Sequence, residues 1–185
     1  MINKKGFSLV EMAMVITILA IVFAVSSSMV IFVVQDLIYS SNVLNMDMLA
    51  NAALDEISYG DNLAGGLAFS QQITASAVNS VTFTDQSGRT VIITLNTGTN
   101  KITRTINAVA DNNFLYYGAR SGINFVVGKN GQMFTYYDST DTTTATAANV
   151  RRVEINFIVR SGAGNFTNWQ GSVERSSSVS TPKFI

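Results

Sequence analysis

The chain has 185 residues, and its 12 basic and 12 acidic side chains give no formal net charge. This length suits one modest domain plus an extended element, and neutrality removes the overall field that favours nucleic-acid binding. Cysteine and histidine are both absent, which excludes disulfides, thiolate nucleophiles, the usual zinc ligands and the commonest general base. We therefore expect no enzymatic activity, catalytic residue, metal or cofactor.

The first predicted element is a long apolar helix near the N-terminus. No charge occurs from Met12 to Val34, a run of 23 residues. At ~1.5 Å per residue such a helix spans roughly 35 Å, enough to cross a hydrocarbon core of about 30 Å. We therefore predict a membrane segment at about 9–34. Lys4 and Lys5 precede it and favour a cytoplasmic N-terminus, with the C-terminal part across the membrane.

Two other interpretations of this segment stay open. The segment would also be apolar if it were the buried helix of a soluble protein, although such helices are seldom so long and so uniformly apolar. A secretory signal peptide would have a shorter apolar region that ends at a small-residue cleavage site. Ala24-Val25-Ser26 is a weak candidate for that site.

One carboxylate, Glu11, lies within the apolar segment that begins at Leu9. A carboxylate is costly in lipid and is expected to have a partner. The stretch from Lys4 to Glu11, KKGFSLVE, resembles the processing site of type IV prepilins and type II secretion pseudopilins.

This resemblance implies how the chain matures and which residues take part. A prepilin peptidase would cleave after Gly6, remove the basic leader 1–6, and methylate the new amino group of Phe7. Glu11 would meet the Phe7 amine of a neighbouring subunit during assembly; a carboxylate near the lipid headgroups without a role is the alternative. The implied partners are the peptidase, other pilin or pseudopilin subunits through the helix, and the bacterial inner membrane before assembly into a pilus or periplasmic pseudopilus.

The helical pattern continues beyond the membrane as a stalk at about 35–58, so that the whole helix covers 7–59. Its apolar positions, expected to pack on the head, are Leu37, Ile38, Leu44, Met48, Leu49, Ala52, Ala53 and Ile57. Gly60 suits the left-handed residue that follows a helix end. Many filament pilins have a proline in the outer part of the membrane helix, whereas this chain has Ser26-Ser27-Ser28 there. Serine hydroxyls can bend a helix, but less than a proline does.

The head, 60–185, is rich in Thr, Asn, Ser and β-branched residues and is predicted to be an antiparallel sheet. Turn sequences separate three strands, at Ser80–Thr84, Thr90–Asn96 and Lys101–Ile106. Asn130-Gly131 predicts a hairpin across 122–137, and 63–77 can be a short helix or a strand. Val150–Arg160 predicts a strand with a buried face of Val153, Ile155, Phe157 and Val159. The expected fold class is α+β and type IV pilin-like, with the long helix packed on this sheet.

A second resemblance covers roughly residues 115 to 160. Tyr136-Tyr137-Asp138, a polar loop and Val150–Ile155 look like W-type minor pilins and J-type minor pseudopilins, in which 176–182 would form a last short strand. This resemblance implies a minor subunit that acts in filament initiation or assembly at or near the tip. A binding module on the same filament, for DNA uptake, adhesion or secreted cargo, is the alternative.

Three further features of the head have a functional and a structural interpretation. Oxygen atoms of Asp138, Asp141 and 142–144 could bind calcium, although such loops are usually only solvated. A group of basic and aromatic side chains could bind single-stranded DNA: Arg151, Arg152, Arg160, Tyr116, Tyr117, Tyr136 and Tyr137. Tyrosines in strands more often pack within sheets, however, and the neutral chain gives no strong nucleic-acid signal. Trp169 could be exposed for adhesion, but a lid over the core is favoured.

Overall fold

The computed structural model describes residues 8–115, 123–128, 130–161 and 171–181. The described residues form two compact units, one ending at Ser41 and the other beginning at Asn42. A single helix, α1 (Leu9–Tyr59), supplies the first unit and continues into the second. The prediction of one long N-terminal helix is confirmed, while Phe7, its expected first residue, lies outside the described residues.

The serine triplet does not interrupt α1. The hydroxyls of Ser27 and Ser28 donate to the carbonyls of Phe23 and Ala24 at 2.8 and 3.0 Å, one turn earlier. Each hydroxyl is therefore satisfied within its own helix, as serine and threonine side chains often are in apolar helices. The helix is therefore continuous through the serine triplet.

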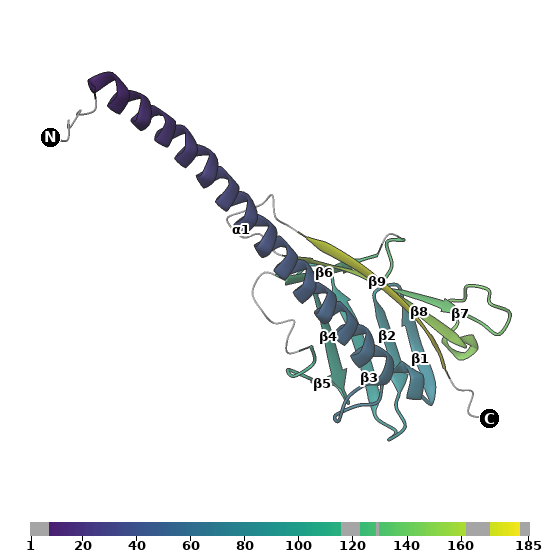
Figure 1. Cartoon of the computed structure of the whole chain (residues 1–185). Coiled ribbons are helices and arrows are strands. Elements are labelled where there is room, and N and C mark those ends of the chain that lie inside the picture. The colour runs from purple at the N-terminus through teal and green to yellow at the C-terminus, as the bar shows by residue number, and fades with distance from the viewer. Residues whose placement is uncertain (1–7, 116–122, 129, 162–170, 182–185) are drawn as a thin grey trace. The chain divides into compact units, whose positions relative to one another are not determined.

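The first sheet of the head follows chain order (Figure 1). Its five antiparallel strands are β1 (Gln72–Ala77), β2 (Ser80–Thr84), β3 (Thr90–Asn96), β4 (Lys101–Ile106) and β5 (Val109–Ala110). The three strands predicted as a meander are confirmed at their expected bounds. The segment 63–77, which the sequence left open, contains a short 3-10 helix, η1 (Leu67–Phe69), and then β1.

The second sheet is built around one long strand. Its elements are β6 (Ile123–Val127), β7 (Phe134–Tyr137), the short helix η3 (Ala147–Asn149), β8 (Arg152–Ser161) and β9 (Ser172–Ser180). β9 pairs with one edge of β8, and β6 and β7 pair one after the other with the opposite edge. The last strand expected at 176–182 is present and begins earlier, whereas Pro182 lies outside the described residues.

The hairpin predicted across 122–137 is wrong. β6 and β7 run in the same direction along β8, with Val127 opposite Phe157 and Phe134 opposite Ile155. A local turn does form, since Gly131 has a φ of 72° and its amide donates to the Gly128 carbonyl at 3.0 Å. The amide of Phe134 then donates to the carbonyl of Val78 at 2.9 Å, which returns the chain to β8 instead of to β6.

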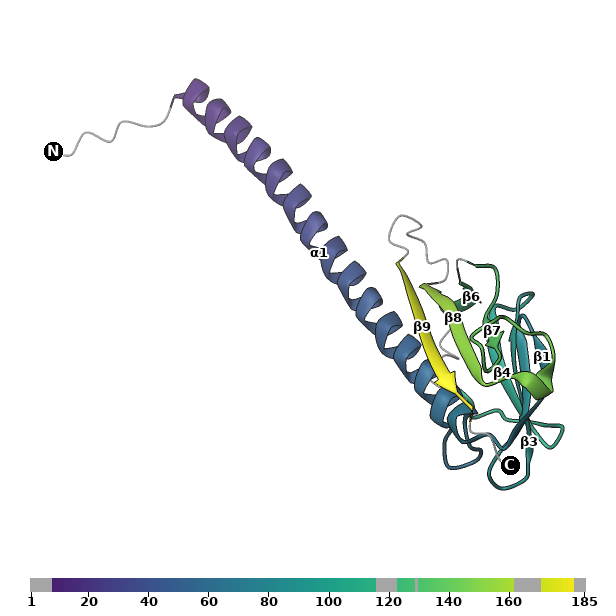
Figure 2. The ribbon, with the colours of Figure 1, turned by 90° about the vertical axis from the view of Figure 1, so that its right-hand side faces the viewer.

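One hydrophobic core joins both sheets to the last turns of α1. Val153, Ile155, Phe157 and Val159 of β8 are all 0% exposed, so the predicted face of this strand is confirmed. Arg175 of β9 donates to Asn51 of α1 at 3.2 Å and pairs with Asp47, and both views show β9 beside this part of the helix (Figure 2).

The predicted stalk face is only partly correct. Leu49, Ala53 and Ile57 are buried, but Leu44 and Met48 are 61% and 63% exposed. The helix is apolar on two opposite sides here, and the side that packs on the sheets consists of Met46, Leu49, Ala50, Ala53, Leu54 and Ile57. The resulting α+β architecture, one long apolar helix packed on antiparallel sheets, is type IV pilin-like as predicted.

Candidate functional site

The start of α1 carries the one predicted site residue that the structure describes. Lys4, Lys5, Gly6 and Phe7 lie outside the described residues. Glu11 is in the first helical turn and is exposed.

Ser8 and Glu11 form a reciprocal cap on the helix. The Ser8 amide donates to Glu11 Oε2 at 2.8 Å, and the Glu11 amide donates to Ser8 Oγ at 3.3 Å. This is a capping box, which satisfies amides that the first turn leaves unpaired. Its sequence signal, a serine followed by a glutamate at the third position, is present in the chain, so this cap could have been predicted from the sequence. Among the described residues, Glu11 Oε1 has no hydrogen-bond partner, so this oxygen is free for a second interaction.

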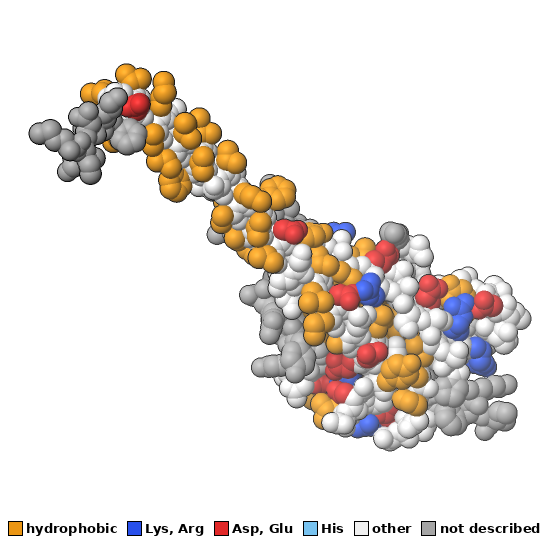
Figure 3. All heavy atoms as spheres, in the orientation of Figure 1, with side chains coloured by type: hydrophobic (Ala, Val, Ile, Leu, Met, Phe, Trp, Pro, Cys, Tyr) orange, Lys and Arg blue, Asp and Glu red, His pale blue; other side chains and the backbone are white. Residues whose placement is uncertain are grey.

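The apolar part of α1 has no cover within the described residues. The exposed fraction of its large apolar side chains ranges from 45% at Val15 to 88% at Leu9. Hydrophobic side chains, coloured orange, dominate its visible surface (Figure 3). The helix is long and apolar enough to cross a membrane, and none of its most apolar stretch of 18 residues is buried. An exposed apolar surface of this size marks a membrane or protein interaction site. The described fold therefore does not support the buried helix of a soluble core.

Arg104 on β4 is a buried cation surrounded by carboxylates. It is 1% exposed, lies 2.7 Å from Asp61, pairs with Asp111, and stacks 4.5 Å from the centre of the Phe114 ring. Burial raises the pKa of Glu56 in the same cluster. Burial opposes ionisation of Asp61 as well, but the hydrogen bond from Arg104 and two backbone amides hold its pKa below the ordinary value. The cluster thus ties the end of α1 to the first sheet.

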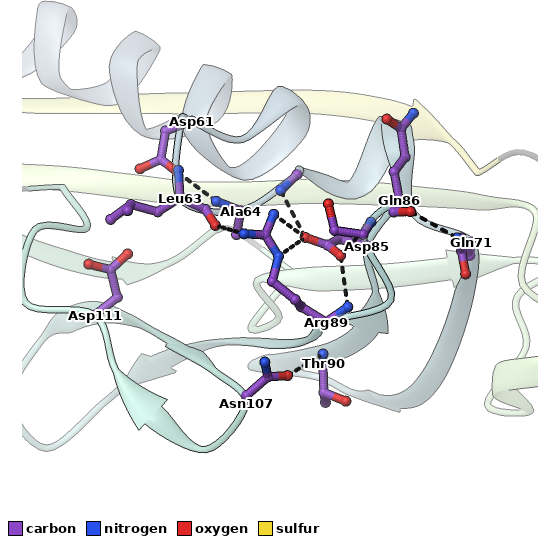
Figure 4. A network of polar contacts seen from close by, with 12 residues as sticks. Asp61, Leu63, Ala64, Gln71, Asp85, Gln86, Arg89, Thr90, Asn107 and Asp111 are labelled. Carbon is purple, nitrogen blue, oxygen red and sulfur yellow. Dashed lines mark hydrogen bonds and ion pairs between the residues drawn. The ribbon is translucent and has the colours of Figure 1, made fainter.

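Asp85 makes a second buried cluster at the turn between β2 and β3 (Figure 4). Its fully buried carboxylate accepts hydrogen bonds from the Gly65 amide at 3.3 Å, from the Ser87 amide at 2.9 Å, and from the Arg89 amide and Nε. Burial alone would raise the pKa of Asp85, but these bonds outweigh it and lower the pKa. Because Arg89 also donates to the Leu63 carbonyl, this cluster fixes the loop after α1.

The loop 138–144 uses its acidic side chains within the fold. Asp138 accepts hydrogen bonds from Thr140 and from the Thr142 amide at 2.7 to 3.1 Å, and Asp141 pairs with Arg152 at 2.5 Å. The described residues contain no group of three or more acidic side chains that could hold a metal ion. One oxygen of each carboxylate, Oδ1, is therefore engaged within the fold.

Several of the side chains considered for DNA binding make contacts within the head. Tyr136 is 6% exposed, and its hydroxyl lies 3.0 and 2.8 Å from the carbonyls of Ala77 and Ser80. Tyr137 stacks under Arg152 at 3.8 Å and donates to Glu154. Tyr116, Tyr117 and Trp169 lie outside the described residues. The described part of the head therefore presents no row of free aromatic rings beside basic groups.

The comparison with known families agrees with the N-terminal features. The family model of the prokaryotic N-terminal methylation motif matches residues 1–27, which include Glu11 and much of the apolar segment. No curated protein and no solved structure matches the chain. The motif is typical of type IV prepilin-like proteins, which are structural subunits, and it implies processing by prepilin peptidase and assembly with other pilin subunits. Together with the apolar helix it indicates membrane anchoring before assembly into a filament.

Proposed function

We propose that this chain is a minor pilin or pseudopilin that acts in filament initiation or assembly, at or near the tip of a type IV pilus or a type II secretion pseudopilus. The main observation that supports this proposal is a methylation motif that leads directly into an exposed apolar helix with a single carboxylate in its first turn. Minor status is supported by the resemblance of 115–160 to W-type and J-type subunits.

The proposed maturation involves four residues before α1. The peptidase cleaves between Gly6 and Phe7, methylates the Phe7 amine, and removes Lys4 and Lys5 with the leader. Before cleavage the chain is a single-pass protein of the bacterial inner membrane, with its head outside the cytoplasm. Removal of the two lysines leaves the N-terminal end of the helix with the Phe7 ammonium and Glu11 as its charged groups.

Glu11 gives the assembling filament its register in this proposal. Its carboxylate pairs with the Phe7 ammonium of a neighbouring subunit, which neutralises both charges in an apolar environment. Desolvation offsets much of the attraction, so the pair contributes more to specificity than to stability. The capping box holds one carboxylate oxygen against Ser8, and Oε1 faces the incoming amine.

Two substitutions separate the charge from the helix cap. Glu11→Gln keeps a capping side chain but removes the charge, so we expect normal processing and loss of the chain from the sheared filament fraction. Ser8→Ala removes one capping bond and keeps the charge, so we expect near-normal incorporation. Immunoblotting of membrane and filament fractions from the native host measures both. Equal incorporation of Glu11→Gln and the unaltered chain would contradict the charge-pairing role.

The proposed minor status has its own test. Quantitative mass spectrometry of sheared filaments should find this chain far below the most abundant pilin, and deletion of its gene should reduce the number of filaments. A tip-borne binding role in DNA uptake, adhesion or cargo recognition would instead leave filament number unchanged and abolish the binding activity. A chain present in amounts equal to the most abundant pilin would contradict minor status.

A further inference from the structure

Three carboxylates face a single cation where α1 meets the first sheet. They belong to Glu56 on the last turn of α1, Asp61 in the loop that follows, and Asp111 after β5, and the cation is Arg104 of β4. No other cation of the described residues pairs with these carboxylates. Arg104 is 1% exposed, and the side chains of Asp111 and Glu56 are 5% and 20% exposed. Like charges that share such a site disfavour full ionisation, so we expect one of the three carboxyls to keep a proton.

The contacts of the cluster single out Glu56. Nη2 of Arg104 donates to Asp61 at 2.7 Å, and Nε donates to Asp111 at 2.8 Å. Glu56 receives no hydrogen bond from this guanidinium, since its nearest oxygen lies 3.9 Å from Nη2. Burial raises the pKa of Glu56, and the Asp61 carboxylate adds to this effect. The Leu115 amide and Arg104 act in the opposite direction on the pKa without reversing the shift.

Glu56 also fastens the segment that leaves the first sheet. This segment, residues 111–115, follows β5 in the chain. Oε2 of Glu56 accepts a hydrogen bond from the Leu115 amide at 3.2 Å. Phe114 is 7% exposed, and its ring stacks on Arg104 at 4.5 Å. Leu115 has a φ of 51°, which residues with a side chain seldom adopt, so this end of the segment depends on the contact with Glu56.

We propose that Glu56 is a proton-operated latch, which holds the segment 111–115 against α1 when its proton is bound and loosens the segment when the proton is lost. The protonated carboxyl keeps its carbonyl oxygen for the Leu115 amide and directs its hydroxyl to the Asp61 carboxylate. Two carboxylates then remain for one guanidinium. All of these groups belong to the second unit, so the latch is independent of the leader and of Glu11 and goes beyond the proposed assembly function.

The direction of the pH response follows from the shift in the pKa of Glu56. In the closed state this pKa is raised above the ordinary value of 4.5, so the closed segment binds the proton more tightly than an open one. The contribution of Glu56 to closure is therefore complete below the ordinary pKa. It is lost as the pH rises through the raised pKa.

The test uses the full chain in detergent micelles with its four glutamates labelled with carbon-13 at the side-chain carboxyl. Through-bond correlation to the backbone identifies the resonance of Glu56 in the unaltered chain. We expect its titration midpoint to lie above 4.5. We also expect the protection of the Leu115 amide against hydrogen exchange to fall by about threefold or more as the pH rises through that midpoint.

A matched pair of substitutions separates the latch from a general effect of charge. Glu56→Gln keeps an acceptor for the Leu115 amide and supplies an N–H donor to Asp61 in place of the proton. Protection of Leu115 should then remain at its low-pH level across the titration range. Asp55→Asn changes the neighbouring carboxylate, which is exposed, and should leave the pH profile of Leu115 as it is in the unaltered chain.

Three results would overturn the proposal. The first is a Glu56 resonance that titrates at or below 4.5, and the second is protection of Leu115 that does not follow this titration. Both are measured on the unaltered chain and need no variant to fold. The third is a Glu56→Gln chain in which protection of Leu115 still falls over the same pH range.

Discussion

At the scale of single residues, Arg104 shows how the head tolerates charge in its interior. One guanidinium on β4 contacts Asp61, Asp111 and the ring of Phe114. Arg104→Met would leave these carboxylates without their cation, and breaking a buried pair in this way costs about 3–5 kcal/mol. We expect that loss in the free energy of unfolding, measured by chemical denaturation in micelles with circular dichroism.

Lys101→Met is the control for Arg104→Met. Lys101 lies on the same strand but is exposed, so its removal should change stability by about 0.5 kcal/mol or less. If the two substitutions had equal effects, the carboxylate cluster would not depend on Arg104.

The buried carboxylate of Asp85 makes the stability of the head depend on pH in acid. Its pKa is lower in the folded chain than the ordinary value of 3.8, so its ionised form stabilises the fold at any pH above that value. This contribution is lost as the pH falls through the lowered pKa. We expect Asp85→Asn to reduce stability at pH 7 and to flatten the acid limb of a stability-against-pH curve. The exposed Asp55→Asn is the control at a surface carboxylate and should change stability by about 0.5 kcal/mol or less. An unchanged curve for Asp85→Asn would contradict the account.

The site residues differ in what the sequence could predict. Glu11 was predicted to be an assembly residue because a lone carboxylate in an apolar run is costly, and this stays a prediction. The capping box with Ser8 could also have been predicted from the spacing of the two residues. Arg104 and Asp85 could not be identified in this way. Their partners Asp61 and Gly65 are 43 and 20 residues distant, and a single sequence does not show which distant groups meet.

At the scale of elements, the end of α1 depends on Gly60. This residue has a φ of 82°, and a Cβ there would lie 2.2 Å from the Ala64 carbonyl oxygen. Gly60→Ala therefore adds a backbone clash to the left-handed strain of about 1–2 kcal/mol. Gly88 has a similar φ of 76° with nothing within 4 Å, so Gly88→Ala isolates the strain alone. We expect Gly60→Ala to lower the midpoint of thermal unfolding clearly more than Gly88→Ala, and equal shifts would exclude the clash.

The elements that the sequence predicted well had unambiguous local signals. The bounds of β2, β3 and β4 followed from turns between alternating strands, and the buried face of β8 followed from its period of two. The stalk face was partly missed because Leu44 and Met48 are apolar but lie opposite the core. Periodicity alone does not tell which of two apolar sides packs on a sheet.

The hairpin failed for a different reason. Asn130-Gly131 specified a local turn correctly, but it carried no information about which strand the chain would meet after the turn. Contacts from Val78, more than 50 residues earlier in the chain, decided that β7 continues along β8.

At the scale of the whole molecule, the two units have opposite surfaces. Residues 9–34 expose apolar side chains almost continuously, whereas the second unit has its own packed core. Such a chain needs an apolar environment for its N-terminal helix at every stage. In the proposed function, a membrane before assembly and a bundle of like helices afterwards supply that environment, and the methylation motif is typical of proteins that pass from one to the other.

The most direct test of this account is the intact mass and N-terminal sequence of the chain from its native host, with and without prepilin peptidase. The account predicts a mature chain that begins at N-methylated Phe7 only when the peptidase is present, and the full precursor when it is absent. A retained leader in the presence of the peptidase, or cleavage near Ser26 as in a secretory signal peptide, would contradict the account.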